Sequence, residues 1–222
     1  MSTITISREF GCGGDSIARG VAQNLRYHLV DKDFIGALLS QYGLVEFDRE
    51  YQTLPGFWEK FNAHREKRRD QMVSMLNQVL GAVARHGNTV ILGRSGFVVL
   101  GGYTDVLHVR LQAPFTTRVE RVMAQEKITF EEAEALVKES DRVRVAFVEE
   151  FYNVPWEAML VFDLVINTAK ISPNLATAWI IEAAKAFAAV PHRGRPRTSS
   201  ISVDPVLAQA VTDQLKCEID HW

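Results

Sequence analysis

Residues 3–25 read TITISREFGCGGDSIARGVAQNL, and this stretch decides the fold class. Isoleucines alternate with hydroxyl residues at its start, and apolar residues recur at helical spacing at its end. Gly11, Gly13 and Gly14 therefore lie between a strand and a helix. Such a turn presents backbone N–H groups and a helix N-terminus to an anion, and glycine allows both the unusual backbone angles and a close approach. The stretch predicts a phosphate-binding turn, with a tight turn that binds no ligand as the alternative.

The full P-loop motif G-x-x-x-x-G-K-[ST] would occupy positions 8–15, and three of its residues are replaced. Arg8 stands at the first glycine, Gly14 at the lysine and Asp15 at the hydroxyl residue, while Ser16 follows one place later. Transfer of a phosphoryl group requires the negative charge of the phosphates to be neutralised. Arg8, at the end of the strand, could supply the missing positive charge. The alternative is that Arg8 only forms a surface pair with a neighbouring carboxylate.

Composition narrows the classes of function. The chain has 222 residues, 47% of them hydrophobic, which is enough to bury a full core. Lys plus Arg is 25 and Asp plus Glu is 27, a balance that argues against coating nucleic acid or an anionic membrane. The two cysteines, Cys12 and Cys217, are far apart and suit a reducing compartment. Without a leader pattern or a long apolar run, the sequence predicts a soluble cytoplasmic protein with no nucleic-acid or membrane partner.

Strand and helix patterns alternate along the chain. After the first strand, strands are predicted at 27–31, 88–94, 106–113 and 160–168. The helices predicted between and after them cover 34–42 with Asp33 as its cap, 57–86, 114–126, 130–151 with a Thr129–Glu132 capping box, and 174–190. This alternation predicts an α/β fold of three layers around a mostly parallel sheet.

The last part of the chain changes character. Residues 191–200, PHRGRPRTSS, are basic and rich in Pro, Gly and Ser, which is typical of a linker. Residues 203–216 could form one more helix that packs either on the domain or on a second subunit, making a homodimer through the C-terminal tail. We therefore expect a domain over 1–190, followed by a linker and helical tail over 191–222.

Several segments together resemble a known family. They are ITISREFGCGGDSIA, VILGRSGFVVL, HVRLQAPFTTRVERV, a D-R-V-R helix and FDLVINTAKIS. This combination, which runs from about residue 3 to residue 185, resembles the cytidylate kinase-like family, relatives of the bacterial cytidylate kinases among the P-loop nucleoside monophosphate kinases. The resemblance implies a P-loop kinase fold with a five-stranded parallel sheet. It also implies an acceptor-binding helical region at about 34–86 and a mobile lid at about 127–155 that closes over ATP.

The resemblance implies roles for residues that would bind the acceptor nucleotide. Gly-Arg at the end of the third strand matches a Gly-Arg-Asp motif that holds the acceptor, so Arg94 is the expected ligand. The aspartate of that motif is replaced by Ser95. After the second strand only Asp31 remains from the family motif, because the acceptor-contacting arginine is replaced by Ala37. Recognition of cytosine or ribose must therefore differ from the family pattern.

The resemblance also places residues near ATP. The lid helix of the family carries Asp and Arg three positions apart, a spacing that Asp141 and Arg144 match on one helix face. Asn167 and Thr168 follow the fifth strand, in the loop expected to touch adenine. Arg144 would then bring positive charge to the phosphates when the lid closes.

Two further arginines, Arg65 and Arg69, lie four apart on one face of the long helix. They could form an anion-binding cradle that replaces the arginine lost at Ala37. The alternative is a solvated helix surface with Glu66 and Asp70 as partners, because exposed charge runs are common on helices.

Arg118 and Arg121 follow the fourth strand and are three apart. Either could meet the γ-phosphate of ATP as an internal arginine finger. The alternative is an ordinary surface pair with Glu120 or Glu126. Cys12, at the N-terminus of a helix, would have a lowered pKa and could be a reactive thiol, but the favoured explanation is a small residue filling a small space.

These observations lead to one main hypothesis and two alternatives. The main one is transfer of the γ-phosphoryl group of ATP to a nucleoside monophosphate, CMP or dCMP. Arg8 and Arg144 would supply positive charge, and Mg²⁺ would be held by Ser16 or Asp15. The backbone that would cradle the β-phosphate comprises Gly11, Cys12, Gly13, Gly14, Asp15 and Ser16. The alternatives are a nucleotide-binding regulatory protein with weak or no catalysis, and a small-molecule kinase with another acceptor.

Overall fold

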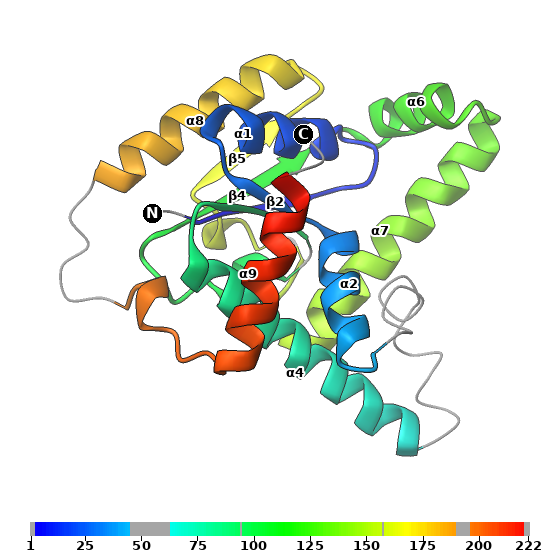
Figure 1. Ribbon diagram of the computed structural model, residues 1–222. Coiled ribbons are helices and arrows are strands. Elements are labelled where there is room, and N and C mark those ends of the chain that lie inside the picture. Colours follow the sequence, from blue (N-terminus) through cyan, green and yellow to red (C-terminus); the bar gives the residue numbers. More distant parts are fainter. Residues whose placement is uncertain (1–2, 45–62, 94, 157, 190–195, 220–222) are drawn as a thin grey trace.

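The computed structural model describes residues 3–44, 63–93, 95–156, 158–189 and 196–219, except for the side chains of 63–68 and 218–219. In these ranges one all-parallel sheet has the strand order β2-β3-β1-β4-β5 (Figure 1). The strands are β1 (Thr3–Arg8), β2 (His28–Val30), β3 (Thr89–Leu92), β4 (Val106–Gln112) and β5 (Leu164–Asn167). The predicted five-stranded parallel sheet is confirmed.

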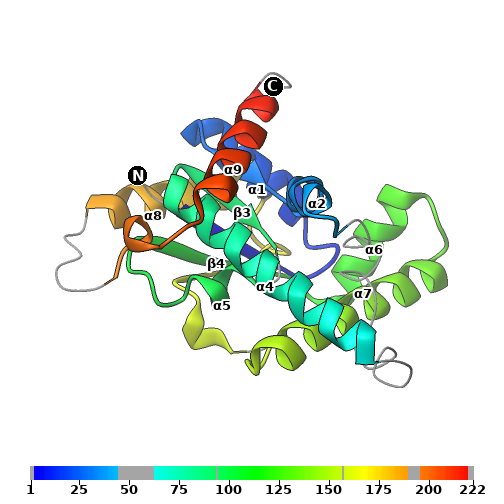
Figure 2. The same cartoon turned by 60° about the horizontal axis from the view of Figure 1, so that its bottom comes forward.

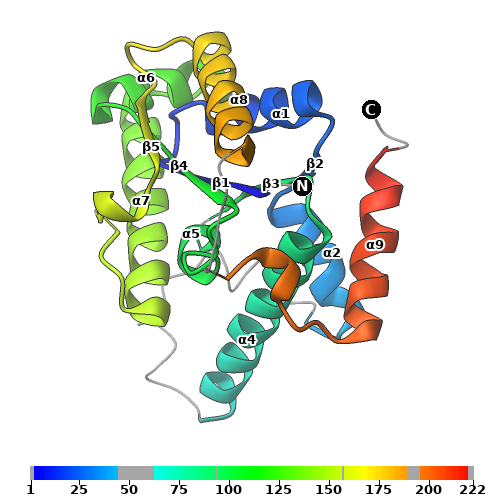
Figure 3. The ribbon, with the colours of Figure 1, turned by 90° about the vertical axis from the view of Figure 1, so that its left-hand side faces the viewer.

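Helices cover both faces of this sheet. One face carries α1 (Gly14–Leu25) and α8 (Pro173–Ala189), as the edge-on view shows (Figure 3). The other face carries α2 (Lys32–Gln41), α4 (Ala63–His86), α5 (Gly96–Val99) and α9 (Pro205–Ile219). A pair of helices, α6 (Phe115–Glu126) and α7 (Phe130–Tyr152), packs together beside these layers. None of the helices in the described ranges combines the length and the apolar character that crossing a bilayer requires.

The central strand β1 shows why the sheet is buried on both faces. Ile4 and Ile6 are fully buried in the cluster formed with α1 and α8. The alternate residues point to the opposite face, because side chains in a strand alternate with a period of two. These residues, Thr3, Thr5 and Ser7, are also buried, and their hydroxyls bond to Thr89, His108 and Arg110, respectively. A polar row thus crosses an otherwise apolar core.

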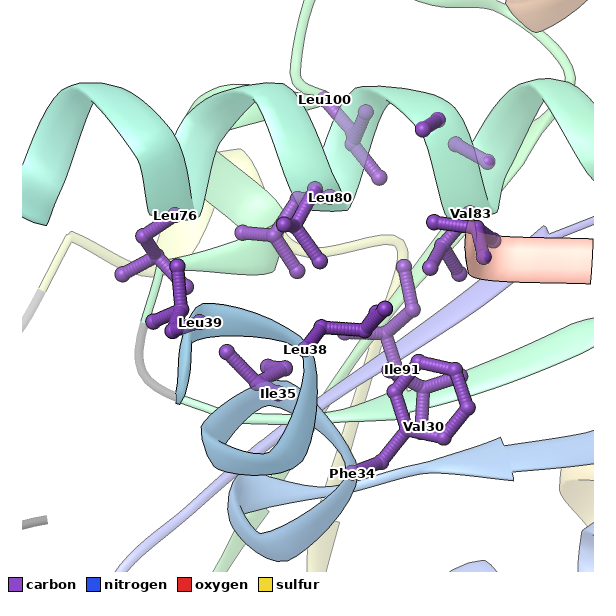
Figure 4. Packing of buried hydrophobic residues seen from close by; sticks show 14 of the residues in the cluster. Val30, Phe34, Ile35, Leu38, Leu39, Leu76, Leu80, Val83, Ile91 and Leu100 are labelled. Carbon is purple, nitrogen blue, oxygen red and sulfur yellow. The ribbon is translucent and has the colours of Figure 1, made fainter. Parts of the chain in front are cut away.

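The larger apolar core lies between the sheet and α2 and α4. In Figure 4, Leu38 of α2 points toward Leu80 of α4, and the ring of Phe34 lies beside Ile91 of β3. The tail helix α9 joins this same cluster through its buried residues Leu207, Val211 and Leu215. Figure 2 shows α9 beside α4. Of the two packings predicted for this helix, packing on its own domain is observed, and a homodimer through the tail stays a prediction.

The start of α2 differs from the sequence prediction. Its N-cap is Asp31 and not Asp33: the Asp31 Oδ1 accepts hydrogen bonds from the backbone N–H groups of Asp33 at 3.0 Å and Phe34 at 3.1 Å. Both aspartates are good capping residues, so local preference could not separate them. The short strand β2 ends at Val30, which puts Asp31 at the junction.

Two other boundaries test the capping and strand patterns. The capping box at the start of α7 is confirmed, because Thr129 and Glu132 exchange side-chain to backbone hydrogen bonds. The predicted strand over 160–168 is shorter than expected. Its first part is a 3₁₀ turn, Met159–Val161, with a fully exposed Leu160, and only Leu164–Asn167 pairs with β4.

Candidate active site

The glycine turn connects β1 to α1 at the carboxyl edge of the sheet. Gly11 and Gly13 have φ of 78° and 79°, the left-handed region that favours glycine. A Cβ on Gly11 would also lie 2.8 Å from the carbonyl oxygen of Arg118, whereas a Cβ on Gly13 would meet nothing within 4 Å. Backbone angles therefore require both glycines, and close packing requires Gly11 in addition.

The first turn of α1 offers unused hydrogen-bond donors. The backbone N–H groups of Gly13, Asp15 and Ser16 bond to no other residue in the described ranges. The first N–H groups of a helix lack intrahelical partners and lie at the positive end of its dipole. The hydroxyl of Ser16 donates to the Gly13 carbonyl at 2.9 Å and stands at the same opening. This arrangement suits a phosphate group.

Arg8 brings positive charge to this opening. Its Nη2 lies 3.3 Å from Asp15 Oδ1, and the exposed fractions of the two side chains are 16% and 75%. The surface pair considered from the sequence is therefore present, with Asp15 as the partner. A pair with so exposed a carboxylate contributes only about 0–1 kcal/mol to stability, so it does not hold the guanidinium firmly.

A cleft of about 440 Å³ opens beside the turn. Arg8, Asp15 and Arg144 line it, from β1, α1 and α7 respectively. Asp31 and Asp33 line it from the start of α2. Residues far apart in the sequence are thus brought to one space that holds both positive and negative side chains.

Arg118, at the start of α6, has a different environment from the one predicted. Its guanidinium pairs with Glu9 at 3.3 Å and Asp141 at 2.6 Å, and not with Glu120 or Glu126. It also donates to the carbonyl oxygens of Ala113 at 3.0 Å and Phe10 at 3.1 Å. Only 7% of the side chain is exposed. Arg118 therefore fixes the loop after β1 and does not line the cleft.

Asp141 and Arg144 lie on one face of α7, as their spacing predicts, and both contact Phe10. Asp141 Oδ1 accepts a hydrogen bond from the Phe10 backbone N–H at 3.3 Å. The Arg144 Cζ lies 5.3 Å from the centre of the Phe10 ring, and its Nη1 donates to the Ser140 carbonyl at 3.0 Å. Asp141 faces the buried Arg118, whereas Arg144 lines the cleft.

Arg121 links the glycine turn to the residue after β5 through hydrogen bonds to backbone carbonyl oxygens. Its guanidinium donates to the carbonyl oxygen of Thr168 at 2.7 Å and to the Cys12 carbonyl at 3.4 Å. The Thr168 hydroxyl is buried and donates to the same Cys12 carbonyl at 2.8 Å. Asn167 Oδ1 accepts from the N–H of Ala169 at 3.0 Å. Contacts of Arg121 with a γ-phosphate, and of Asn167 and Thr168 with adenine, stay predictions.

Cys12 does not have the lowered pKa expected at a helix N-terminus. It is only 1% exposed, and burial raises the pKa of its thiol to about 11. The expected lowering at a helix N-terminus is outweighed by desolvation of the thiolate, which disfavours the charged form. Cys12 is therefore a buried thiol at neutral pH, and the explanation as a small residue filling a small space is the correct one.

The predicted acceptor-binding residues are described only in part. Arg94 and the Arg65 side chain lie outside the described residues. Arg69 pairs with Glu150 of α7 at 3.4 Å, and its Cζ lies 4.6 Å from the centre of the Phe151 ring. Its partner is thus not Asp70. Ser95 is 3% exposed and does not line the cleft, whereas Asp31 does.

Sequence reasoning missed Glu9 and Arg110. Glu9 accepts a hydrogen bond from the Ala113 N–H at 3.0 Å and pairs with Arg118. Arg110 is 3% exposed, donates to Ser7 Oγ at 3.1 Å and places its Cζ 3.9 Å from the centre of the Trp156 ring. A charged residue inside the apolar strand VLHVRLQA was the available signal, because such a residue is rarely buried without partners.

The sequence model of the cytidylate kinase-like family matches residues 3–170. The chain belongs to this family. A protein named cytidylate kinase from Natronomonas pharaonis is 26% identical over 203 residues, which cover 90% of this chain and 98% of that protein. Another cytidylate kinase, from Pyrobaculum neutrophilum, is 29% identical over 177 residues, or 78% of this chain and 88% of that protein.

Solved structures agree on the fold. A protein from Eubacterium ventriosum has a TM-score of 0.63 at 20% identity and covers 84% of this chain and 99% of its own. A shikimate kinase from Bacteroides thetaiotaomicron has a TM-score of 0.51 at 11% identity, with 83% and 98% covered. This member of the cytidylate kinase-like family therefore has the P-loop kinase fold.

Proposed function

We propose that the protein transfers the γ-phosphoryl group of ATP to a nucleoside monophosphate, CMP or dCMP. The observation that carries the proposal is the glycine turn itself, with its unused N–H groups at the start of α1 and Arg8 lining the adjacent cleft. Membership of the cytidylate kinase-like family and relatives named cytidylate kinase support the choice of substrate class.

Each part of the site has a role in this reaction. The N–H groups between Gly11 and Ser16 bind the β-phosphate of ATP. Arg8 and Arg144 line the cleft and stabilise the negative charge that spreads over the transferred group. Asp31 and Arg94 bind the acceptor. Because phosphoryl transfer depends mainly on position and charge, these residues need no strong general base.

Mg²⁺ fits this site as an ion with ligands from both the protein and the phosphates. No cluster of three or more His, Cys, Asp or Glu side chains that could hold a metal is found in the described ranges. Mg²⁺ does not require one, because it keeps several waters and binds one or two carboxylates together with substrate phosphates. The exposed carboxylate of Asp15 or the hydroxyl of Ser16 would hold it. Bound Mg²⁺ would neutralise charge on the β- and γ-phosphates.

Specific replacements favour a different acceptor as the second candidate. Ser95 carries no charge, is buried and does not line the cleft, so a carboxylate contact to cytosine or ribose is missing there. Ala37 likewise lacks the guanidinium that the family uses for an acceptor phosphate. A small-molecule acceptor would tolerate both changes. A nucleotide-binding protein without turnover would in addition tolerate glycine at position 14.

A coupled ADP-release assay tests the three candidates. The purified chain is incubated with ATP, Mg²⁺ and, in turn, CMP, dCMP, UMP, AMP and GMP, and then with hydroxylated small molecules. We expect turnover with CMP or dCMP. Turnover only with a small molecule would support the second candidate, and binding of ATP without ADP release from any mixture would support a regulatory role.

A matched pair of variants on α7 connects the assay to the site. Arg144→Gln removes a charge from the cleft, whereas Arg142→Gln removes one from the exposed face of the same helix. We expect ADP release to fall strongly only in Arg144→Gln. Circular dichroism of both variants would show that the helix still forms.

A further inference from the structure

The space beside Gly14 is filled by Arg8. A Cβ built on Gly14 would lie 2.9 Å from Arg8 Cγ and 3.0 Å from Arg8 Cβ. Carbon atoms that are not bonded prefer about 3.5–4.0 Å, so these distances are strongly repulsive. Gly14 is not among the glycines with positive φ, so its backbone would accept any residue. What demands glycine at position 14 is the stem of the Arg8 side chain.

The Arg8 stem cannot easily move away. Arg8 is the last residue of β1 and pairs with Leu111 of β4, so the position of its Cβ is set by the sheet. The next residue, Glu9, continues this pairing through its N–H, which donates to the Leu111 carbonyl at 3.2 Å. Rotation about the Cα–Cβ bond would move Cγ, but it would leave the Arg8 Cβ 3.0 Å from a Cβ on residue 14.

Positions 8 and 14 are also two of the positions at which this chain departs from the P-loop motif. The P-loop motif has glycine at the position of Arg8 and lysine at the position of Gly14. In this chain the cationic side chain is at position 8, and the glycine is at position 14. Arginine at position 8 without glycine at position 14 would crowd the turn. Glycine at position 14 without arginine at position 8 would remove the positive charge of the turn.

We propose that Arg8 and Gly14 are an exchanged pair, in which the Arg8 guanidinium acts as the phosphate-binding cation of the turn and Gly14 leaves the space through which it passes. The phosphate-binding part rests on the proposed function, whereas the steric part does not. Asp15 holds the guanidinium weakly, because its carboxylate is 75% exposed. A polyphosphate can replace Asp15, since the guanidinium fork binds two phosphate oxygens at once.

A stability experiment tests the steric part without any ligand. Gly14→Ala is made in the natural chain and in an Arg8→Gly chain, and urea midpoints are compared. We expect Gly14→Ala to lower the midpoint when Arg8 is present and to raise it when Arg8 is absent, because alanine is the better helix residue. The control is Gly81→Ala in α4, whose Cβ would meet only Ile201 at 3.4 Å and should act equally in both backgrounds. An equal effect of Gly14→Ala in both backgrounds would overturn the pair.

A binding experiment tests the charge part. Affinity for ATP with Mg²⁺ is measured by titration calorimetry for Arg8→Gly, Gly14→Lys and the double variant, which restores the glycine and the lysine of the motif. We expect each single variant to lose affinity at least about tenfold and the double variant to regain most of it, a loss of the size found for one charged hydrogen bond. A double variant that binds no better than the singles would overturn the assignment of the cation.

The two experiments also separate failure of the pair from failure of the proposed function. If the natural chain neither binds ATP nor releases ADP, the proposed function is wrong, and so is the phosphate-binding role of Arg8. The change of sign in the urea midpoint would still establish that the Arg8 side chain excludes a side chain at position 14. Circular dichroism of every variant guards against loss of the fold.

Discussion

Arg118 and Arg8 both contact the glycine turn, and they differ in their partners far more than in their burial. Arg118 supports the first half of the turn and has two carboxylates and two carbonyl oxygens as partners. Arg8 supports the second half and has one exposed carboxylate. Their exposed side-chain fractions, 7% and 16%, would hardly separate them. Arg118 therefore belongs to the scaffold, whereas Arg8 lines the cleft with an exposed carboxylate as its partner.

The largest effect is expected from removing the scaffold arginine. Arg118→Ala leaves the partly buried Asp141 without its cation and leaves Glu9 with Arg110 at 4.0 Å, so we expect the free energy of unfolding to fall by about 3–5 kcal/mol. Urea denaturation followed by circular dichroism measures it. Arg142→Ala, on the exposed face of α7, is the control and should change the free energy by less than about 0.5 kcal/mol. A loss as small as that of the control would mean that Arg118 is not part of the scaffold.

The next effect should fall on activity and not on stability. Arg8→Ala removes a cation from the cleft, so we expect kcat/KM for the proposed reaction to fall by about 10²–10³-fold, as when one charge-stabilising donor is lost from an active site. Its only carboxylate partner in the described ranges is exposed, so the free energy of unfolding should change by less than about 1 kcal/mol. Unchanged kcat/KM, or a stability loss like that of Arg118→Ala, would remove the distinction between the two arginines.

The buried His108 should make the stability of the protein depend on pH. His108 on β4 is 6% exposed, its Nδ1 lies 2.7 Å from Thr5 Oγ1, and burial lowers its pKa from 6.5. Because the unfolded chain takes up a proton near pH 6.5 and the folded chain does not, stability should fall as the pH drops below that value.

Urea midpoints at pH 7.5 and 5.5 measure this dependence, and His108→Asn should reduce it. Part of the slope should remain, because burial and the nearby His86 also lower the pKa of His28. An unchanged slope in His108→Asn would show that His108 does not titrate with unfolding.

The smallest effect is expected for the partner of Arg8. Asp15→Asn weakens a pair whose carboxylate is 75% exposed, so the free energy of unfolding should change by less than about 0.5 kcal/mol. The same urea titration measures it. A larger loss would mean that Arg8 is held in place as firmly as Arg118, and would weaken its assignment to a ligand.

Much of the fold could be predicted from local patterns. Alternating and helical spacings are set by the geometry of each element, and they located the five strands and the long helices of the described ranges. The capping box of Thr129 and Glu132 was readable because both partners lie within one turn. The glycines of the turn were readable because positive φ is a local demand. Choices between neighbours, such as Asp31 or Asp33 as a cap, depend on where β2 ends and were not readable.

The candidate site was predictable in its position but not in its contacts. The sequence placed Arg8, Asp15 and Arg144 near the phosphates, and the structure brings all three to one cleft. No sequence pattern pairs Arg118 with Asp141, which is 23 residues away, or predicts the burial that raises the pKa of Cys12. Such contacts depend on long-range packing, which no local spacing encodes.

By itself, the sequence determined that this protein is a parallel α/β protein of the cytidylate kinase-like family whose glycine turn lacks the usual lysine. Hydrophobic periodicity and glycine positions are sufficient for that, because they act within a few residues. Only the tertiary structure decided which arginine is committed to the scaffold and which faces the cleft. It also showed that the stem of Arg8 fills the space beside Gly14, because strand pairing fixes the one and helix packing fixes the other.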